Sequence, residues 1–66
     1  MNNELMITFF GGGYVYFSTN AADVNTALER FKIVCERNGI NIDNMKIVSA
    51  TLRDEFAGDI EYKKFD

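Results

Sequence analysis

The stretch Ile7–Phe17, ITFFGGGYVYF, places three consecutive glycines between two runs of β-branched and aromatic residues. Glycine-rich segments can cradle a phosphate, but a P-loop needs a lysine followed by a serine or threonine, and a helix must follow. Here Gly13 is followed by Tyr14 and a second run of strand-forming residues. Because glycine tolerates the positive φ angles of hairpin loops, the stretch predicts a β-hairpin turning at Gly11–Gly13.

The residues on either side of the glycines extend this predicted hairpin. Residues 5–10 (LMITFF) and 14–19 (YVYFST) are rich in the residue types that suit a pleated, half-buried surface. We expect these two segments to be strands that pair antiparallel.

Residues 20–39, NAADVNTALERFKIVCERNG, predict an amphipathic helix. Thr19 or Asn20 is expected to cap it, with Asp23 adding negative charge to its first turn. Gly39 is expected to end it in the left-handed conformation, with Ile40 packing back. The apolar residues follow the i, i+3, i+4, i+7 spacing of one helical face, at Val24, Ala27, Leu28, Phe31, Val34 and Cys35.

The rest of the chain predicts a second pair of strands. A turn at residues 41–44 precedes a strand at 45–54, with Val48, Ala50 and Leu52 on one face. After a turn around Gly58, residues 60–65 alternate, with Ile60 and Tyr62 on one face and Glu61 and Lys63 on the other. The predicted fold is one small α+β domain over residues 1–66. It is a two-layer β-β-α-β-β arrangement, in which an antiparallel sheet of about four strands carries one helix on one face.

The first hairpin has too many apolar side chains for such a fold. A sheet covered by one helix should be apolar on one face and polar on the other, but here both faces carry large apolar groups. We therefore expect the outer-face residues to be buried by another chain, a second copy or a foreign protein. The alternative is that they pack over the hairpin or under the C-terminal segment. These residues are Met6, Phe10, Tyr14 and Tyr16.

Ile33 lies on the side of the predicted helix opposite the apolar stripe, since it follows Val24 by nine residues at about 100° per residue. It is either an isolated exposed apolar residue, which is common, or an additional partner contact.

Composition and charge argue against several classes of function. The net charge is −3, from ten acidic and seven basic residues, and no cluster of Lys and Arg favours nucleic-acid binding. One cysteine and no histidine argue against a disulfide or a zinc site. The longest apolar run is too short to cross a membrane, and no signal peptide is evident, so we expect a cytoplasmic protein without a membrane partner.

Catalytic chemistry has little to draw on in this sequence. With no histidine, the usual general base at neutral pH is missing. Cys35 lies on the apolar helical face, where a cysteine is an inert core residue. We therefore predict no enzymatic activity, no catalytic residue, no cofactor and no metal. Acidic residues gather around Gly58 and could form a docking patch for a basic surface, including mimicry of nucleic acid; they are Asp54, Glu55, Asp59 and Glu61.

The sequence thus predicts a non-enzymatic protein-interaction module that forms a homo-oligomer. Its size and composition are typical of phage or mobile-element accessory proteins, including inhibitors of host defence proteins. The alternative is a small-ligand-binding protein or subunit, with an aromatic pocket between protomers.

Overall fold

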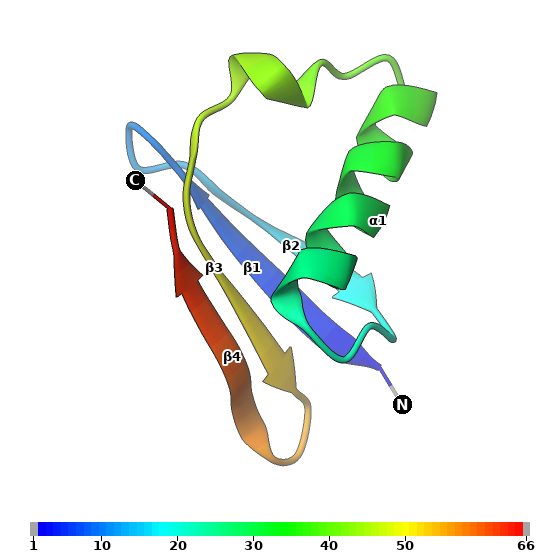
Figure 1. Ribbon diagram of the computed structural model, residues 1–66, viewed down its shortest axis with the longest axis vertical. Coiled ribbons are helices and arrows are strands. Elements are labelled where there is room, and N and C mark those ends of the chain that lie inside the picture. Colours follow the sequence, from blue (N-terminus) through cyan, green and yellow to red (C-terminus); the bar gives the residue numbers. More distant parts are fainter. Residues whose placement is uncertain (1, 66) are drawn as a thin grey trace.

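The computed structural model of the chain describes residues 2–65, apart from the side chain of Asp43, and shows an antiparallel sheet with one helix on one face (Figure 1). The strand order is β2-β1-β3-β4, so the two hairpins meet along β1 and β3. The predicted α+β class is confirmed. In chain order the elements are β1 (Asn3–Phe9), β2 (Tyr14–Thr19), α1 (Val24–Arg37), the 3-10 helix η1 (Ile42–Asn44), β3 (Ile47–Asp54) and β4 (Gly58–Lys64).

The three glycines form the turn of the first hairpin, as predicted. The N–H of Phe9 donates to the carbonyl of Gly13 at 2.7 Å, and the N–H of Gly12 donates to the carbonyl of Phe9 at 3.1 Å. Gly11 and Gly12 have φ angles of 99° and 97°, which residues other than glycine rarely adopt. A strand follows the glycines, whereas a P-loop leads into a helix.

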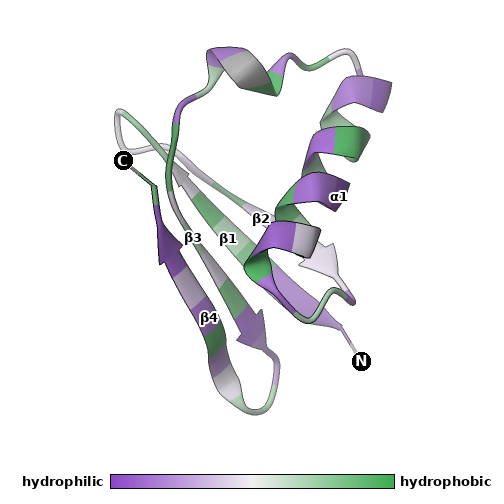
Figure 2. Ribbon diagram, in the orientation of Figure 1, coloured by the Kyte–Doolittle hydropathy of each residue, from purple (hydrophilic) through white to green (hydrophobic). Residues whose placement is uncertain are grey.

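The core lies between α1 and the two central strands. Leu5 of β1 pairs with Leu52 of β3, and both side chains are fully buried between the sheet and α1. Figure 2 shows the hydrophobic stripe of α1 turned toward the sheet and its hydrophilic side turned outward. Burying one large aliphatic side chain contributes about 1.5–3 kcal/mol, so these few residues supply much of the stability. The buried cluster is Leu5, Ile7, Ala21, Val24, Ala27, Leu28, Ala50 and Leu52.

Asp23 caps the helix, and the prediction of Thr19 or Asn20 as the cap was wrong. The Asp23 carboxylate accepts hydrogen bonds from the Thr26 backbone N–H at 2.9 Å and the Thr26 hydroxyl at 2.8 Å. Thr19 still belongs to β2, and its hydroxyl accepts from the N–H of Ala21 at 3.1 Å. The side chain of Asn20 accepts a hydrogen bond from Arg30. The chain needs the residues after Thr19 to turn from the sheet into the helix, so capping falls to the last polar residue before Val24.

The C-terminal end of α1 follows the prediction at Gly39, whereas Ile40, which was expected to pack back, has 47% of its surface exposed. Gly39 has a φ of 73°, in the left-handed region. The N–H of Ile40 donates to the carbonyl of Cys35 at 2.9 Å, and that of Gly39 donates to the carbonyl of Glu36 at 3.1 Å. These are the two hydrogen bonds of a Schellman motif, which satisfies carbonyls that the helix would otherwise leave free.

Two irregularities in the sheet change the simple alternation of β3 and β4. The register shifts between Thr8 and Phe9, so Phe9 pairs with Ile47, and Ile47 packs on the core. The predicted face of β3 is therefore right for Ala50 and Leu52, but at the start of β3 the core residue is Ile47 rather than Val48. A second shift, between Leu52 and Arg53, leaves Ile60 as an extra residue in β4.

Val34 departs from the predicted helical stripe, with 42% of its surface exposed. At about 100° per residue it lies at the margin of the stripe centred on Val24, Leu28 and Phe31, where the sheet no longer covers it.

The acid sensitivity of the fold should depend in part on Asp23. The hydrogen bonds from Thr26, first that of its backbone N–H, hold the pKa of Asp23 below its ordinary value of 3.8. A lowered folded-state pKa means that the ionised cap stabilises the fold fully above pH 3.8 and that this stabilisation is lost as the pH falls through the lowered value. Asp23→Ala is expected to lower the melting temperature at neutral pH by on the order of 5 °C.

Asp23→Asn is the matched control, because asparagine also caps helices but does not titrate. Melting temperatures measured by circular dichroism from neutral to strongly acidic pH should fall less steeply for Asp23→Asn than for the wild type. If the melting temperatures of the two proteins fell equally with pH, the ionised Asp23 carboxylate would not be the source of the acid sensitivity.

Candidate functional site

The face of the sheet turned away from α1, called the outer face below, carries rows of side chains that cross all four strands. One row runs from Tyr16 of β2 through Met6 of β1 and Thr51 of β3 to Tyr62 of β4. Directly opposed side chains in an antiparallel sheet lie about 4.5–5.5 Å apart at Cβ, so this row is a continuous strip. An uncharged strip of two tyrosines, a methionine and a threonine thus crosses the middle of the outer face.

The two neighbouring rows are more polar. On one side of the strip, Tyr14 is followed by Thr8, Ser49 and Lys64. On the other side lie Ser18, Glu4, Arg53 and Asp59. The Nε atom of Arg53 lies 3.2 Å from an Asp59 carboxylate oxygen, and both side chains are exposed, so the pair adds little stability. Positive and negative charges balance across this face.

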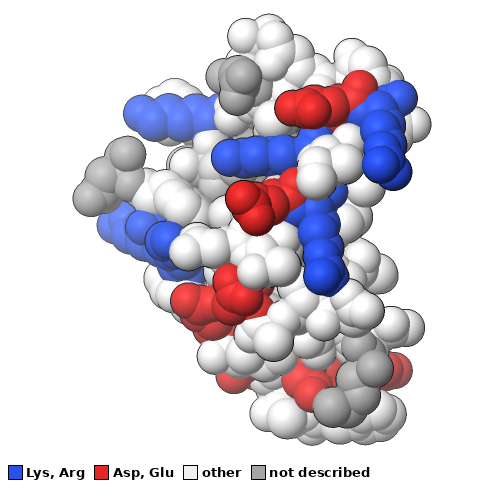
Figure 3. Space-filling model, turned by 45° about the vertical axis from the view of Figure 1, so that its right-hand side comes forward, with Lys and Arg blue, Asp and Glu red and all other residues white. Residues whose placement is uncertain are grey.

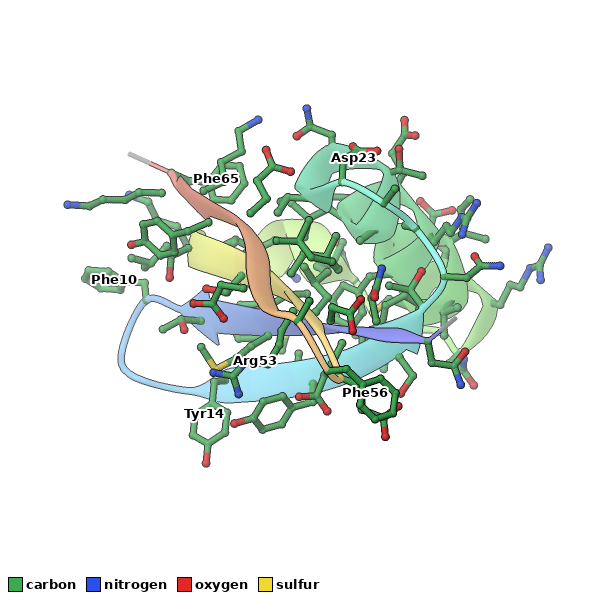
Figure 4. The ribbon with its side chains drawn as sticks, turned by 90° about the horizontal axis from the view of Figure 1, so that it is seen from below. Phe10, Tyr14, Asp23, Arg53, Phe56 and Phe65 are labelled. Atoms are coloured by element: carbon green, nitrogen blue, oxygen red, sulfur yellow. The ribbon has the colours of Figure 1, made fainter. Side chains whose placement is uncertain are left out.

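The three tyrosines of the outer face are exposed. Tyr14, Tyr16 and Tyr62 have 61%, 58% and 63% of their surface open, and the rings of Tyr14 and Tyr16 meet edge to face with centroids 5.6 Å apart. Figure 4 shows Tyr14 on the side of the sheet away from the Asp23 end of α1. Tyrosine combines a large apolar ring with a hydroxyl, and it is enriched at protein interfaces.

The structure brings together three of the five residues predicted for an interface. Met6 and Tyr16 are direct cross-strand neighbours, and Tyr14 adjoins Tyr16. Phe10 is exposed in the hairpin loop, where the Lys46 ammonium lies 5.8 Å from its ring centroid. Ile33 is exposed on α1, on the other layer of the molecule, so it cannot share a contact surface with the outer face.

The four predicted docking acids do not all lie together. Asp54 accepts hydrogen bonds from the backbone N–H groups of Phe56 and Ala57 at 2.7 and 3.3 Å, and so stabilises the β3–β4 turn. Glu55 is exposed in that turn, and Asp59 follows it on the outer face. Glu61 instead pairs with the core residue Leu52, so its side chain lies on the helix side of the sheet.

Glu61 has a structural task that the sequence did not reveal. Its Oε1 atom accepts a hydrogen bond from the N–H of Val24, the first residue of α1, at 2.7 Å. On the same side of β4, the ammonium of Lys63 donates to the side-chain oxygen of Asn25 at 2.8 Å. Because helix N-termini carry free N–H groups and positive partial charge, a carboxylate from β4 fixes the helix on the sheet.

Two aromatic residues of the exposed surface were missed by the sequence analysis. Tyr62 joins the strip because the bulge at Ile60 turns Glu61 toward the helix and Tyr62 to the outer face. Phe56 lies at the tip of the β3–β4 turn with 88% of its surface exposed, on the same side of the sheet as Tyr14 (Figure 4). The alternation of residues 60–65 was a signal for Tyr62, but nothing in the sequence indicated the direction of Phe56.

The outer face also has a hollow of about 250 Å³. This is just below the range of about 300–1,000 Å³ that is usual for ligand pockets. Its walls are formed by Glu4, Met6, Tyr16, Thr51, Arg53 and Asp59.

The described residues offer neither a metal centre nor a membrane-spanning helix. They contain no group of three or more His, Cys, Asp or Glu side chains that could hold a metal ion. Within the same residues, no helix combines the length and the apolar character needed to cross a membrane. Figure 3 shows positive and negative side chains interleaved over the helix side of the molecule. Cys35 is buried in α1 with a free thiol.

No protein-family model, curated protein or solved structure matches this chain.

Proposed function

We propose that this chain is a protein-interaction module whose contact surface is the outer face of its sheet. The observation that carries the proposal is the strip from Tyr16 through Met6 to Tyr62, on the face that α1 does not cover. An uncovered sheet face of a small domain is expected to be polar. Here its middle row is apolar and aromatic, and its flanking charges balance, so a protein can bury it without isolating a charge.

The partner of this surface can be the chain itself or another protein. A role as a phage or mobile-element accessory protein that inhibits a host defence protein is a narrower form of the proposal. That role rests on the size and composition of the chain and stays a prediction.

Small-ligand binding between protomers is the second candidate function. The hollow beside Tyr16 and Arg53 favours it, since an aromatic ring and a planar guanidinium can both stack on a planar ligand. A second protomer over this face would enclose the hollow.

The proposal is tested by charge substitution on the strip. Tyr16→Lys combined with Tyr62→Lys places two ammonium groups on the apolar row, and we expect it to abolish binding of partner proteins. Tagged wild type and variants are expressed in the native host, and the proteins retained at near-stoichiometric amounts are compared. Circular dichroism establishes that each variant is folded.

Val34→Lys is the matched control, because Val34 is an exposed apolar residue on α1, away from the strip. The proposal requires that partners kept by the wild type and by Val34→Lys are lost from the double variant. Equal retention by all three proteins would overturn it. Ile33→Lys in the same series tests whether Ile33, on the exposed surface of α1, is an additional partner contact.

A further inference from the structure

The sheet has one open edge that can extend it, along β2. The N–H of Phe9 donates to the carbonyl of Gly13, which makes these two residues a hydrogen-bonded pair. Every second pair along the β1–β2 register is then hydrogen-bonded as well, so the backbone groups of Val15, Phe17 and Thr19 point toward β1. In an antiparallel pair the intervening residues point their N–H and C=O groups the other way. Those of Tyr14, Tyr16 and Ser18 therefore point off the edge of the sheet. Within residues 2–65, β2 has β1 as its one strand neighbour.

The two edge strands of this sheet differ in their protection against pairing. Natural edge strands are blunted by charged side chains and bulges. β4 has both, with a register shift at Ile60 and four charged residues, Asp59, Glu61, Lys63 and Lys64. β2, with the sequence YVYFST, has no charged residue and no proline, and its pairing with β1 runs without a shift. The edge of β2 is thus open to another strand.

The helix side of β2 is also incompletely covered. α1 packs mainly across β1, β3 and β4. Val15 and Phe17, the two apolar β2 residues that face the helix layer, are only partly buried, and Phe17 meets Phe31 edge to face at a centroid distance of 5.5 Å. Apolar side chains at this margin would gain burial from apolar groups on an added strand.

We propose that a second copy of this chain occupies this edge, with the two β2 strands antiparallel about a two-fold axis at Tyr16. The inference rests on the proposed function, because it names a partner of the same interaction module. To keep both outer faces on one side, residues of even number must pair with residues of even number. Tyr16 then lies opposite Tyr16 of the second copy, and Tyr14 opposite Ser18. This register forms about six backbone hydrogen bonds.

The sequence of β2 is self-complementary in this antiparallel register, which favours a second copy as the occupant of the edge. Charges directly opposite one another across strands destabilise pairing when they have the same sign. Because β2 is uncharged, two copies meet without such repulsion, although each chain has a net charge of −3. On the helix side the two-fold axis places Val15 against Phe17 of the other copy. On the outer face it places Tyr16 against Tyr16 and Tyr14 against Ser18, so no apolar side chain is opposed by a charge.

The pairing would enlarge the proposed interaction surface. The two sheets become one continuous sheet, and Tyr14 and Tyr16 of both copies adjoin at its centre. The strip of one copy then continues into the strip of the other, which presents a symmetric aromatic surface to a further protein.

Ser18→Pro tests the pairing directly. The Ser18 N–H points off the edge, so proline removes it without breaking the β1–β2 ladder, and proline is tolerated at such edge positions. Because the two-fold axis repeats each contact, the substitution removes two hydrogen bonds from the dimer. We expect its dissociation constant to rise by about 100-fold or more. Sedimentation from micromolar to millimolar concentration should show a dimer for the wild type and a folded monomer for Ser18→Pro. Tyr62→Lys, on the far strand, should remain a dimer.

A cysteine cross-link tests the register and covers the case in which Ser18→Pro does not fold. Tyr16→Cys is made in a Cys35→Ala background. Opposed residues of a hydrogen-bonded antiparallel pair have Cα atoms about 5.5 Å apart, within the range that a disulfide spans. Oxidation should give a covalent dimer for Tyr16→Cys and none for Tyr62→Cys in the same background.

Three outcomes would overturn the edge pairing. The first is that the wild type stays monomeric at millimolar concentration. The outer face would then remain the proposed site for a foreign partner, which the double variant Tyr16→Lys with Tyr62→Lys tests separately. The second is a dimer that survives Ser18→Pro and is broken by Tyr62→Lys, which indicates association through the outer faces. The third is a dimer without a Tyr16→Cys cross-link.

Discussion

Leu52→Ala is expected to lower the free energy of unfolding by about 2–5 kcal/mol, the largest effect of any substitution considered for this chain. Leu52 has no exposed surface, and its cross-strand neighbour Leu5 has none either. Truncation removes the transfer free energy of three carbon atoms and leaves a cavity under α1 that a rigid sheet cannot close. A domain of this size has a total stability of only about 3–10 kcal/mol, so the variant should be largely or partly unfolded at ambient temperature.

Urea denaturation followed by circular dichroism measures this change, at one fixed protein concentration so that any dimer contributes equally. Ile60→Ala is the matched control. It removes a side chain of the same size from the adjacent strand, at a position that is 44% exposed and lies in the β4 bulge. Its cost should be below about 1 kcal/mol. Equal losses in the two variants would contradict a core centred on Leu5 and Leu52.

The fold class could be predicted because local sequence signals agree with one another. The glycines between two strand-forming runs predict the first hairpin, and the helical spacing from Val24 to Cys35 predicts α1. A single helix then has one place to bury its stripe, on one face of an antiparallel sheet. The strand order β2-β1-β3-β4 depends on contacts between residues distant in the chain, which local periodicity does not encode.

The sequence-based predictions fail where tertiary contacts override local preference. Three polar residues near the helix start could each cap it, and the path of the chain out of β2 decides for Asp23. The shift at Ile60 turns Glu61 toward the N-terminus of α1, where it binds the N–H of Val24. Alternation correctly put Glu61 and Tyr62 on opposite faces of β4. Because a shift of one residue exchanges the two faces of a strand, alternation alone could not tell which of the two faces the helix.

The candidate site was predictable in part for the same reason. Tyr14, Tyr16 and Met6 belong to a hairpin whose register follows from its turn, and their shared face could be read from the alternation of two strands. Tyr62 is brought beside them by pairing of β1 with β3 and of β3 with β4. The strip therefore exists only once the sheet is assembled.

The three glycines of the first hairpin are not equivalent, and substitution should separate them. Gly11 and Gly12 have φ angles of 99° and 97°, whereas the φ of Gly13 is not positive. A Cβ atom at any of the three would meet no other atom within 4 Å, so steric contact with the rest of the protein cannot account for a difference. Changing Gly11 and Gly12 together to alanine should cost about 2–4 kcal/mol, since a left-handed conformation costs an alanine roughly 1–2 kcal/mol at each position.

Gly13→Ala is the matched control within the same loop. Alanine at a position with an allowed backbone conformation restricts the unfolded chain, and it should stabilise the fold by about 0.4–1 kcal/mol. Urea denaturation of the two variants should therefore move the midpoint in opposite directions. If Gly13→Ala destabilised the protein as much as the double variant, the need for glycine would not be explained by the positive φ angles of Gly11 and Gly12. Opposite shifts would show that the turn needs glycine at its first two positions only, which leaves Gly13 free to vary beside Tyr14.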